Sequence, residues 1–186
     1  MLDIENYPHT VTPFQHQLNH LKNHMREKSW GLLWEQGTAK TKPIIDTAAV
    51  MYSEGEIDGL LVVAPPGVER NWNTDEIPKH MPVEISLDVR VQVFSTARKA
   101  TAAHKRAMNS LFTHDGLSVL LISYNGFMTK EGKELVWKFL QKRKCLYVLD
   151  EAHNIKTPNA KRTKSIVASG KYAKFRRILT GTPVAI

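Results

Sequence analysis

Two carboxylates and an imidazole follow a run of apolar residues in the C-terminal part of the sequence. Asp150, Glu151 and His153 come directly after the apolar stretch 145–149. A short, continuous aliphatic run is typical of a central strand in a parallel sheet that is covered on both faces. Because ligands bind at the carboxyl ends of such strands, these side chains could hold a metal ion and act on water. A solvated surface can also carry adjacent acids, so the interpretation depends on the rest of the chain.

A second group of residues could bind phosphate. The sequence Glu-Gln-Gly-Thr-Ala-Lys-Thr, which ends at Thr41, joins a predicted strand to a predicted helix. In a phosphate loop, backbone N–H groups and a helix N-terminus bind the anion, here at Gly37, Thr38 and Ala39. Lys40 would reach the β- and γ-phosphates, and the Thr41 hydroxyl would ligate Mg²⁺. An ordinary strand–loop–helix turn with an exposed lysine is the alternative.

Ala39 stands where phosphate loops usually have glycine before the lysine. If the loop requires a positive φ angle there, the alanine methyl group costs on the order of 1 kcal/mol. Alanine has the smallest side chain that could replace glycine, so we still expect a phosphate loop.

The phosphate loop and the acidic pair together form the two halves of a magnesium–nucleotide site. Each follows a predicted strand, and their order along the chain fits such a site. We expect Asp150 to hold the metal, through water, and Glu151 to orient or deprotonate the attacking water. The predicted cofactors are therefore ATP and Mg²⁺.

Hydrophobic periodicity places these residues on alternating helices and strands. Such alternation predicts βαβ units and a mostly parallel central sheet with helices on both faces, an α/β fold. The stretch 78–89 contains two prolines and has no clear period, so it is predicted to be a surface excursion. Helices are predicted at about 13–28, 41–53, 67–77, 103–111, 135–140 and 159–170, and strands at 31–34, 60–64, 91–94, 119–123, 145–149 and 177–179.

The composition restricts the class of protein. A length of 186 residues suits one domain, and 42% hydrophobic with 24% charged residues is ordinary for a globular protein. A single cysteine allows no disulfide within the chain, so a cytoplasmic location is expected, or a nuclear one in a eukaryote. The apolar runs are too short to span a membrane. A net charge of +8 favours a polyanionic partner, although a lysine-rich soluble surface would give the same value.

With both halves of the site in view, the chain resembles the first RecA-like lobe of superfamily 2 helicases, and more narrowly their Swi/Snf-type branch. The resemblance extends over nearly the whole chain and rests on five motifs in order. They are Pro13-Phe14-Gln15, the stretch from Val63-Ala64-Pro65-Pro66 to Asn71-Trp72, Ser123-Tyr124, Asp150-Glu151-Ala152-His153 and Leu179-Thr180-Gly181-Thr182-Pro183.

The resemblance implies a RecA-like P-loop NTPase fold and a role for each motif. Gln15 would read adenine, since a carboxamide both donates and accepts hydrogen bonds. Asp150 to His153 would be a DEAH-type motif II. The Thr180 and Thr182 hydroxyls would link His153 to the nucleic-acid side of the protein. The residues implied to face nucleic acid are Pro66, Arg70, Ser123, Tyr124 and Lys156.

Basic residues recur in three groups that could neutralise phosphates, although a solvated helix face is the alternative for any one lysine. By the resemblance the partner is duplex DNA bound without sequence specificity, while the residue types leave RNA open. The groups are Lys156, Lys161, Arg162 and Lys164; Arg98, Lys99, Lys105 and Arg106; and Lys171, Lys174, Arg176 and Arg177.

Helicases of this type also have a second RecA-like lobe that supplies arginine fingers. We expect residues 1–186 to form a single ATP-binding lobe, without the second, that hydrolyses ATP slowly and does not translocate. The alternatives are a non-hydrolysing module in which ATP changes DNA affinity, and a fragment of a longer motor. A second lobe on another chain, or self-association, could complete the site.

Overall fold

Six strands form a single parallel sheet in the computed structural model, which describes residue 4 and residues 7–181. The strand order is β1-β6-β5-β2-β4-β3, and every pair of neighbours is parallel. The carboxyl ends of all six strands therefore meet along one edge. The strands are β1 (Ser29–Leu32), β2 (Gly59–Ala64), β3 (Val89–Val93), β4 (Leu117–Ser123), β5 (Cys145–Leu149) and β6 (Phe175–Leu179).

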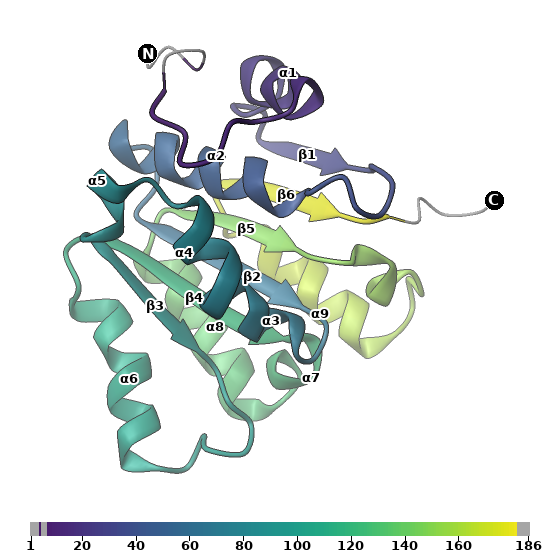
Figure 1. Cartoon of the computed structure of the whole chain (residues 1–186). Coiled ribbons are helices and arrows are strands. Elements are labelled where there is room, and N and C mark those ends of the chain that lie inside the picture. The colour runs from purple at the N-terminus through teal and green to yellow at the C-terminus, as the bar shows by residue number, and fades with distance from the viewer. Residues whose placement is uncertain (1–3, 5–6, 182–186) are drawn as a thin grey trace.

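Helices cover both faces of this sheet (Figure 1). One face packs against α1 (Gln15–Asn23), α2 (Thr41–Ser53), α3 (Val68–Asn71), α4 (Ile77–His80) and α5 (Val83–Ser86). The opposite face packs against α6 (Ala102–Thr113), α7 (Tyr124–Phe127), α8 (Lys130–Lys142) and α9 (Lys161–Gly170). A π-helical turn, η1 (Trp72–Glu76), joins α3 to α4, and a 3₁₀ turn, η2 (Ala152–Ile155), follows β5. Within the described chain, no helix has both the length and the apolar character needed to cross a membrane.

The central strands are apolar throughout because both of their faces are buried. In β2, Leu60 and Val62 pack in one hydrophobic cluster, whereas Leu61 and Val63 pack in the cluster on the other face. All residues of β2, β4 and β5 are buried, while β3, at one edge of the sheet, is mostly half-buried. This pattern confirms the predicted α/β fold with a central parallel sheet.

Two predictions for the segment between β2 and β3 were wrong. The predicted helix at 67–77 is divided among α3, the π-helical turn and α4. The predicted surface excursion at 78–89 contains α5, and Met81 and Ile85 are buried in the core. The prolines do not interrupt these short helices, since Pro78 lies in the first turn of α4 and Pro82 is the N-cap of α5.

Arg177 connects the last strand to the first helix. Its side chain is buried, and its guanidinium donates hydrogen bonds to the carbonyl oxygens of His24, Met25 and Glu27, just beyond α1. Burial lowers the pKa of Arg177 to about 10. The interpretation of this arginine as a phosphate contact was therefore wrong, because its side chain is buried and both terminal nitrogens donate to carbonyl oxygens inside the protein.

The other members of that basic group also lie away from the carboxyl edge of the sheet. Lys174 pairs with Glu56, and the Arg176 side chain donates to Ser29 Oγ at 2.8 Å. Lys171 and Lys174 precede β6 and Arg176 is its second residue, so all three lie towards the amino ends of the strands. This group is removed from the candidate nucleic-acid surface.

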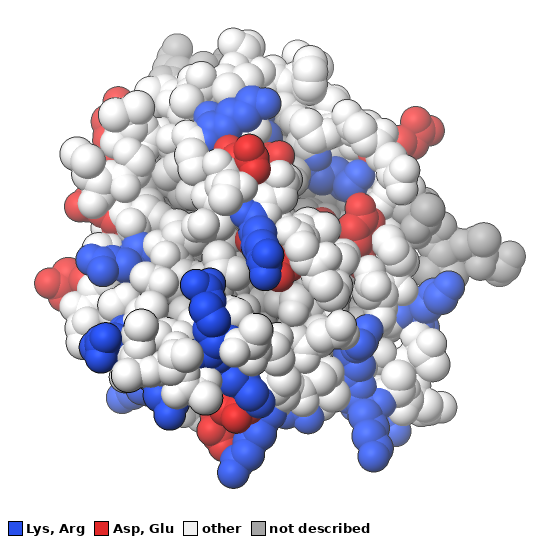
Figure 2. All heavy atoms as spheres, turned by 60° about the horizontal axis from the view of Figure 1, so that its bottom comes forward, with Lys and Arg blue, Asp and Glu red and all other residues white. Residues whose placement is uncertain are grey.

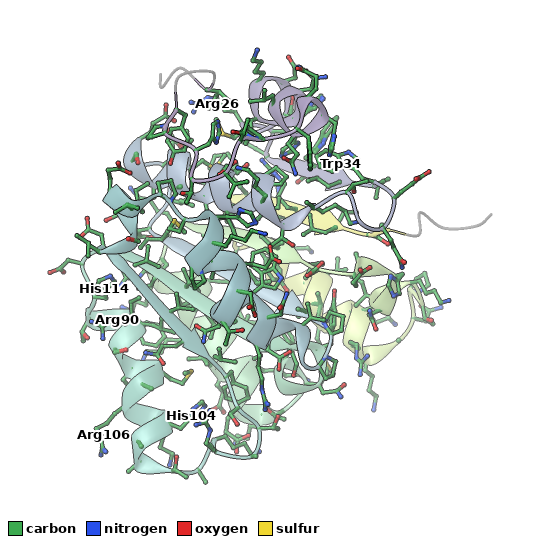
Figure 3. The ribbon with its side chains drawn as sticks, in the orientation of Figure 1. Arg26, Trp34, Arg90, His104, Arg106 and His114 are labelled. Atoms are coloured by element: carbon green, nitrogen blue, oxygen red, sulfur yellow. The ribbon has the colours of Figure 1, made fainter. Side chains whose placement is uncertain are left out.

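His20 gives the packing of α1 a predictable dependence on pH. The ring is buried edge-on against Trp34, which lies beside α1 in Figure 3, with ring centroids 6.0 Å apart. Neither ring nitrogen has a hydrogen-bond partner among the described residues. Burial, with smaller contributions from Arg177 and His24, lowers the pKa of His20 from 6.5 to about 4.

We expect His20 to lower the stability of the fold in acid. The unfolded chain binds a proton at this residue near pH 6.5, whereas the folded chain does so only near pH 4, so stability falls as the pH drops through this window. The loss is roughly 2–3 kcal/mol by about pH 4.5. Urea denaturation at neutral and acid pH would measure it.

Between neutral pH and about pH 4.5, His20→Leu should lose roughly 2–3 kcal/mol less stability than the wild type loses. His16→Leu, on the exposed side of the same helix, is the matched control. Burial also lowers the pKa values of His80 and His104, so these residues contribute to the loss of stability in acid in every variant. The contribution of His20 is therefore the difference between the variants. Equal acid losses in His20→Leu and the wild type would contradict the prediction.

Candidate nucleotide site

Three loops meet at the carboxyl edge of the sheet, on the right of Figure 1. The loop after β1 carries Lys40, whose charge acts on Asp150 after β5. The segment after β6 touches the same loop, since a Cβ atom added at Gly181 would lie 2.6 Å from Cγ of Gln36. The predicted phosphate loop, acidic pair and post-β6 segment are therefore close together in space.

The loop after β1 has the backbone conformation that a phosphate loop requires. Gly37 and Ala39 have positive φ angles of 79° and 50°, and α2 begins directly afterwards at Thr41. The Lys40 ammonium donates to the carbonyl oxygens of Trp34 at 3.1 Å and Glu35 at 2.9 Å. Lys40 is thus folded over the loop in which it resides.

The backbone of this loop fits an anion. Among the described residues, no hydrogen bond uses the backbone N–H groups of Gly37, Ala39 or Lys40. A Cβ atom at Gly37 would have nothing within 4 Å, so glycine serves the positive φ angle there and not a close contact. Free N–H groups before a helix N-terminus, beside a lysine, are the donors that bind phosphate oxygens.

Helix α1 holds this loop through Gln17. The Gln17 side chain is buried, donates to the Ala39 carbonyl at 3.0 Å and accepts from the Phe14 N–H at 2.8 Å. The sequence interpretation emphasised Gln15, which is exposed and donates to Asn19 at 3.1 Å. Helical phase indicates the difference, because Gln17 shares the buried face of α1 with Leu21.

Ala39 has the unfavourable positive φ angle that its position in the loop suggested. A non-glycine residue at φ 50° is disfavoured by about 1 kcal/mol. Ala39→Gly should therefore raise the free energy of unfolding by up to about 1 kcal/mol, measured by urea denaturation. Ala107→Gly, at a half-buried position in the middle of α6, should lower it by at least roughly 0.5–1 kcal/mol. A loss of stability in Ala39→Gly would contradict this account.

Asp150 is held in a buried position by its neighbours. Its carboxylate accepts from the Glu151 N–H on Oδ1 and from the Trp72 indole N–H on Oδ2, each at 2.9 Å. Its backbone N–H donates to the Val63 carbonyl at 2.8 Å. Burial raises the pKa of Asp150, while the Trp72 hydrogen bond and the charge of Lys40 oppose that shift.

Glu151 has a strained backbone next to Asp150. Its φ and ψ angles of 48° and 55° lie in the left-handed region, which costs a non-glycine residue on the order of 1–2 kcal/mol. Its Oε2 atom lies 3.3 Å from Nδ1 of His153, and its carbonyl accepts from the Asn154 amide at 2.9 Å. Strain of this kind concentrates at functional sites, where the surroundings fix a side-chain direction.

The donor set fits magnesium bound together with a nucleotide. Across the part of the chain that the structure describes, no three acidic, histidine or cysteine side chains gather into a metal site. Mg²⁺ does not need such a group, because it binds through one or two carboxylates, phosphate oxygens and water. Asp150 and the Thr41 hydroxyl are ligands of the required type.

Comparison with known proteins identifies the family. The model of the SNF2-related domain matches residues 14–185. The chain belongs to this family. The relation to the DEAH-type subgroup implied by the sequence remains a proposal.

Curated relatives of this SNF2-related domain are much longer proteins. The chain is 27% identical over 155 residues to DNA excision repair protein ERCC-6-like of Homo sapiens, covering 81% of the chain and 11% of that protein. It is 34% identical over 130 residues to Protein CHROMATIN REMODELING 19 of Arabidopsis thaliana, covering 67% of the chain and 16% of that protein. The chain thus spans less than a fifth of either relative.

Solved structures confirm the RecA-like fold of the SNF2-related domain. A Sulfolobus solfataricus SWI2/SNF2 ATPase core in complex with dsDNA superimposes with a TM-score of 0.68 at 25% identity, over 98% of this chain and 34% of that one. The UvsW helicase from bacteriophage T4 gives a TM-score of 0.63 at 12% identity, over 92% of this chain and 53% of that one. The second similarity concerns the fold alone.

Two residues of the SNF2-related domain that were predicted to face nucleic acid are buried instead. Ser123 Oγ accepts from the Gly126 N–H at 3.0 Å and caps α7. The Tyr124 hydroxyl donates to the Asp150 carbonyl at 2.8 Å, and burial raises the pKa of Tyr124, which keeps this donor protonated. Their side chains support the site from within and are not direct surface contacts.

Trp72, the last residue of the motif that begins at Val63, contributes a hydrogen bond as well as packing. The indole is buried, and its N–H bonds Asp150 across a separation of 78 residues. An indole N–H needs a partner when it is buried, which is the one signal that could have suggested such a bond. The identity of the partner requires the fold.

The remaining predicted residues divide by exposure. Pro66, Arg70 and Lys156 are exposed, so they are available to a partner. Thr180 is buried, and its backbone N–H donates to the Leu32 carbonyl at 3.2 Å. Thr182 lies outside the described residues, so its predicted link to His153 stays a prediction.

Basic side chains gather on the face that lies at the bottom of Figure 1 and is turned towards the viewer in Figure 2. Figure 2 shows Lys and Arg predominating along the lower part of this face. Arg106 points away from the sheet on α6, whereas His104 turns towards it (Figure 3). Arg162 on α9 donates to Asn125 of α7 at 2.8 Å, which ties that basic helix to the segment after β4. Two of the three predicted basic groups thus remain on the candidate surface, although Lys99 pairs with Glu131 at 2.8 Å.

Proposed function

We propose that this SNF2-related domain binds ATP with Mg²⁺ and hydrolyses it, slowly by itself and faster on duplex DNA. The observation that carries the proposal is the placement of Lys40, Asp150 and Glu151 at one edge of the sheet, because β1 and β5 both pair in parallel with β6. A phosphate-binding loop, a buried Asp150 and a half-buried Glu151 at this edge are the parts that phosphoryl transfer needs.

Each residue has a defined role in this proposal. The loop amides and Lys40, as a Walker A motif, bind and orient the β- and γ-phosphates, and Gln15 contacts adenine. Thr41 and Asp150 hold Mg²⁺, which when bound supplies positive charge to the phosphate oxygens. Glu151, in a DEAH-type motif II, orients water and takes its proton.

The proposed DNA contact follows from exposure and charge. Pro66, Arg70 and Lys156 are exposed on segments that leave β2 and β5 at the same edge as the site. The similar Sulfolobus core was solved with dsDNA, which supports a duplex as partner. Phosphate contacts of this kind carry no sequence information, so binding should be sequence-nonspecific.

A second RecA-like lobe is part of the proposal. The chain corresponds to 34% of the Sulfolobus core, so the full activity of such proteins involves more polypeptide than this lobe. An arginine finger can raise phosphoryl-transfer rates by about 10³–10⁵. We propose that a second lobe, or a second copy of this chain, supplies that group, and that residues 1–186 alone do not translocate.

An ATPase assay with and without duplex DNA, across protein concentrations, tests the proposed function. We expect slow turnover that rises with DNA. Activity that rises faster than linearly with protein concentration would indicate completion of the site by a second copy. Wild-type turnover no higher than that of Glu151→Gln would favour a non-hydrolysing module in which ATP changes DNA affinity.

DNA affinity should fall steeply with salt. If about five phosphates are neutralised, the slope of log K against log salt is about −4 to −5. Lys156→Ala should reduce that slope by about one, whereas Lys142→Ala, at the C-terminal end of α8, should leave it unchanged. Fluorescence anisotropy with duplexes of unrelated sequence would measure both quantities. A sequence-specific, salt-insensitive complex would contradict backbone binding.

A further inference from the structure

Asp150 receives one hydrogen bond from each of the two segments that follow β2 and β4. The Trp72 indole N–H, in the segment after β2, donates to its carboxylate Oδ2 at 2.9 Å. The Tyr124 hydroxyl, in the segment after β4, donates to its backbone carbonyl at 2.8 Å. Both donors are about 1% exposed, so the bonds are shielded from water.

We propose that Trp72 and Tyr124 are positioning residues that make magnesium binding at Asp150 depend on DNA contact with these two segments. The inference rests on the proposed function, since it concerns how the same site is regulated. It assigns to two buried aromatic side chains a task beyond core packing.

The Trp72 bond fixes the orientation of the carboxylate. An indole N–H is a donor only, and a buried donor without a partner costs about 1–3 kcal/mol. The Glu151 N–H holds the other oxygen, Oδ1, at 2.9 Å. With a donor on each oxygen, the plane of the carboxylate is set, and a displaced Trp72 would turn it.

The Tyr124 bond fixes the backbone at the same residue. The Asp150 N–H donates to Val63 of β2, and the Asp150 carbonyl accepts from Tyr124 at the start of α7. Asp150 is thus held on both sides of its Cα atom. A shift of α7 would move the carboxylate through its own main chain.

The outer parts of both segments can reach a partner. Arg70 is exposed two residues before Trp72, and Asn125 is exposed one residue after Tyr124 and bonded to Arg162 of the basic helix α9. Trp72 also begins the π-helical turn, an irregular geometry that is frequent at functional sites. A DNA phosphate bound at Arg70 or Asn125 would therefore contact a residue no more than two positions along the chain from Trp72 or Tyr124, the two residues that bond Asp150.

Two single substitutions test this coupling. Tyr124→Phe removes one hydroxyl, and Trp72→Phe removes the indole N–H. The readouts are the Mg²⁺ concentration for half-maximal ATPase activity and the ratio of activity with and without duplex DNA. We expect the Mg²⁺ requirement to rise about 5–10-fold in Trp72→Phe and the DNA ratio to fall several-fold in both variants, as expected for one or two lost hydrogen bonds.

The chain offers matched controls for both changes. Tyr147→Phe also removes a buried hydroxyl bond, to Ser169 at 3.1 Å, on the face of the sheet covered by α8 and α9. Trp137→Phe changes a tryptophan on α8 that packs against Tyr172. Tyr147→Phe loses a similar buried bond and Trp137→Phe makes the same residue change at a half-buried position, and both should keep the wild-type Mg²⁺ requirement and DNA ratio.

The outcomes separate the inference from the proposed function. If Tyr124→Phe and Trp72→Phe behave like their controls while the wild type is stimulated by DNA, the coupling is overturned and the ATPase stands. If Trp72→Phe does not fold, Tyr124→Phe decides alone. If the wild type turns over no ATP, DNA-dependent strengthening of Mg²⁺–nucleotide binding is the readout. A wild type that binds no nucleotide overturns both proposals.

Discussion

Lys40→Ala should abolish measurable binding of ATP·Mg²⁺. The ammonium group provides the only positive side-chain charge of the loop that ends at Thr41, next to amides that face solvent. Charge-assisted hydrogen bonds are each worth about 1.5–3 kcal/mol, so losing two of them lowers affinity by roughly 100-fold or more. Isothermal titration calorimetry with ATP and Mg²⁺ would measure the loss.

The neighbouring lysine cannot replace Lys40. Lys42 is buried and its ammonium lies 2.6 Å from Asp46 Oδ2, the oxygen that His9 also approaches at 3.2 Å. Its charge is used inside the protein beneath the N-terminal segment. Lys142→Ala, an exposed change far from the loop, is the control and should bind as the wild type does. Unchanged nucleotide affinity in Lys40→Ala would refute the phosphate-loop assignment.

Glu151→Gln should abolish hydrolysis and preserve nucleotide binding. Glutamine keeps the shape of the side chain but cannot take a proton from water, and general-base catalysis of this kind is worth about 10²–10⁴ in rate. Binding should survive because the contacts of Lys40 and Asp150 are unchanged. Single-turnover hydrolysis and calorimetry on the same sample would separate the two steps.

Two comparisons make this result specific to Glu151. Glu134→Gln, an exposed change on α8, removes the same charge elsewhere and should retain full activity. Because Glu151 Oε2 lies 3.3 Å from His153 Nδ1, the substitution also changes this contact, so His153→Gln measures that contribution separately. Hydrolysis at the wild-type rate in Glu151→Gln would exclude it as the base.

The sequence specified the strands and the site wherever the determinants are local. The apolar runs of β2, β4 and β5 predicted buried parallel strands, and the residues after them arrived at one edge because parallel strands end together. The positive φ at Ala39 followed from the pattern of the loop itself. These features depend on neighbours within a few residues.

The errors arose where a side chain takes its role from a distant partner. Nothing near Tyr124 in the sequence indicates that its hydroxyl bonds Asp150, 26 residues away, and nothing near Arg177 indicates bonds to carbonyls about 150 residues earlier. Such assignments need tertiary contacts, which short-range patterns do not contain.

The place of β1 in the sheet has a consequence for how the chain is made. Among the described strands, β1 pairs only with β6, and Arg177 of β6 holds the end of α1. A ribosome releases residues 29–41 long before residues 175–179. The phosphate loop therefore lacks its supporting strand until residues 175–179 have been made, whereas β2, β4 and β5 can pair earlier. Pulse proteolysis of nascent chains should find residues 29–41 protected later than these central strands.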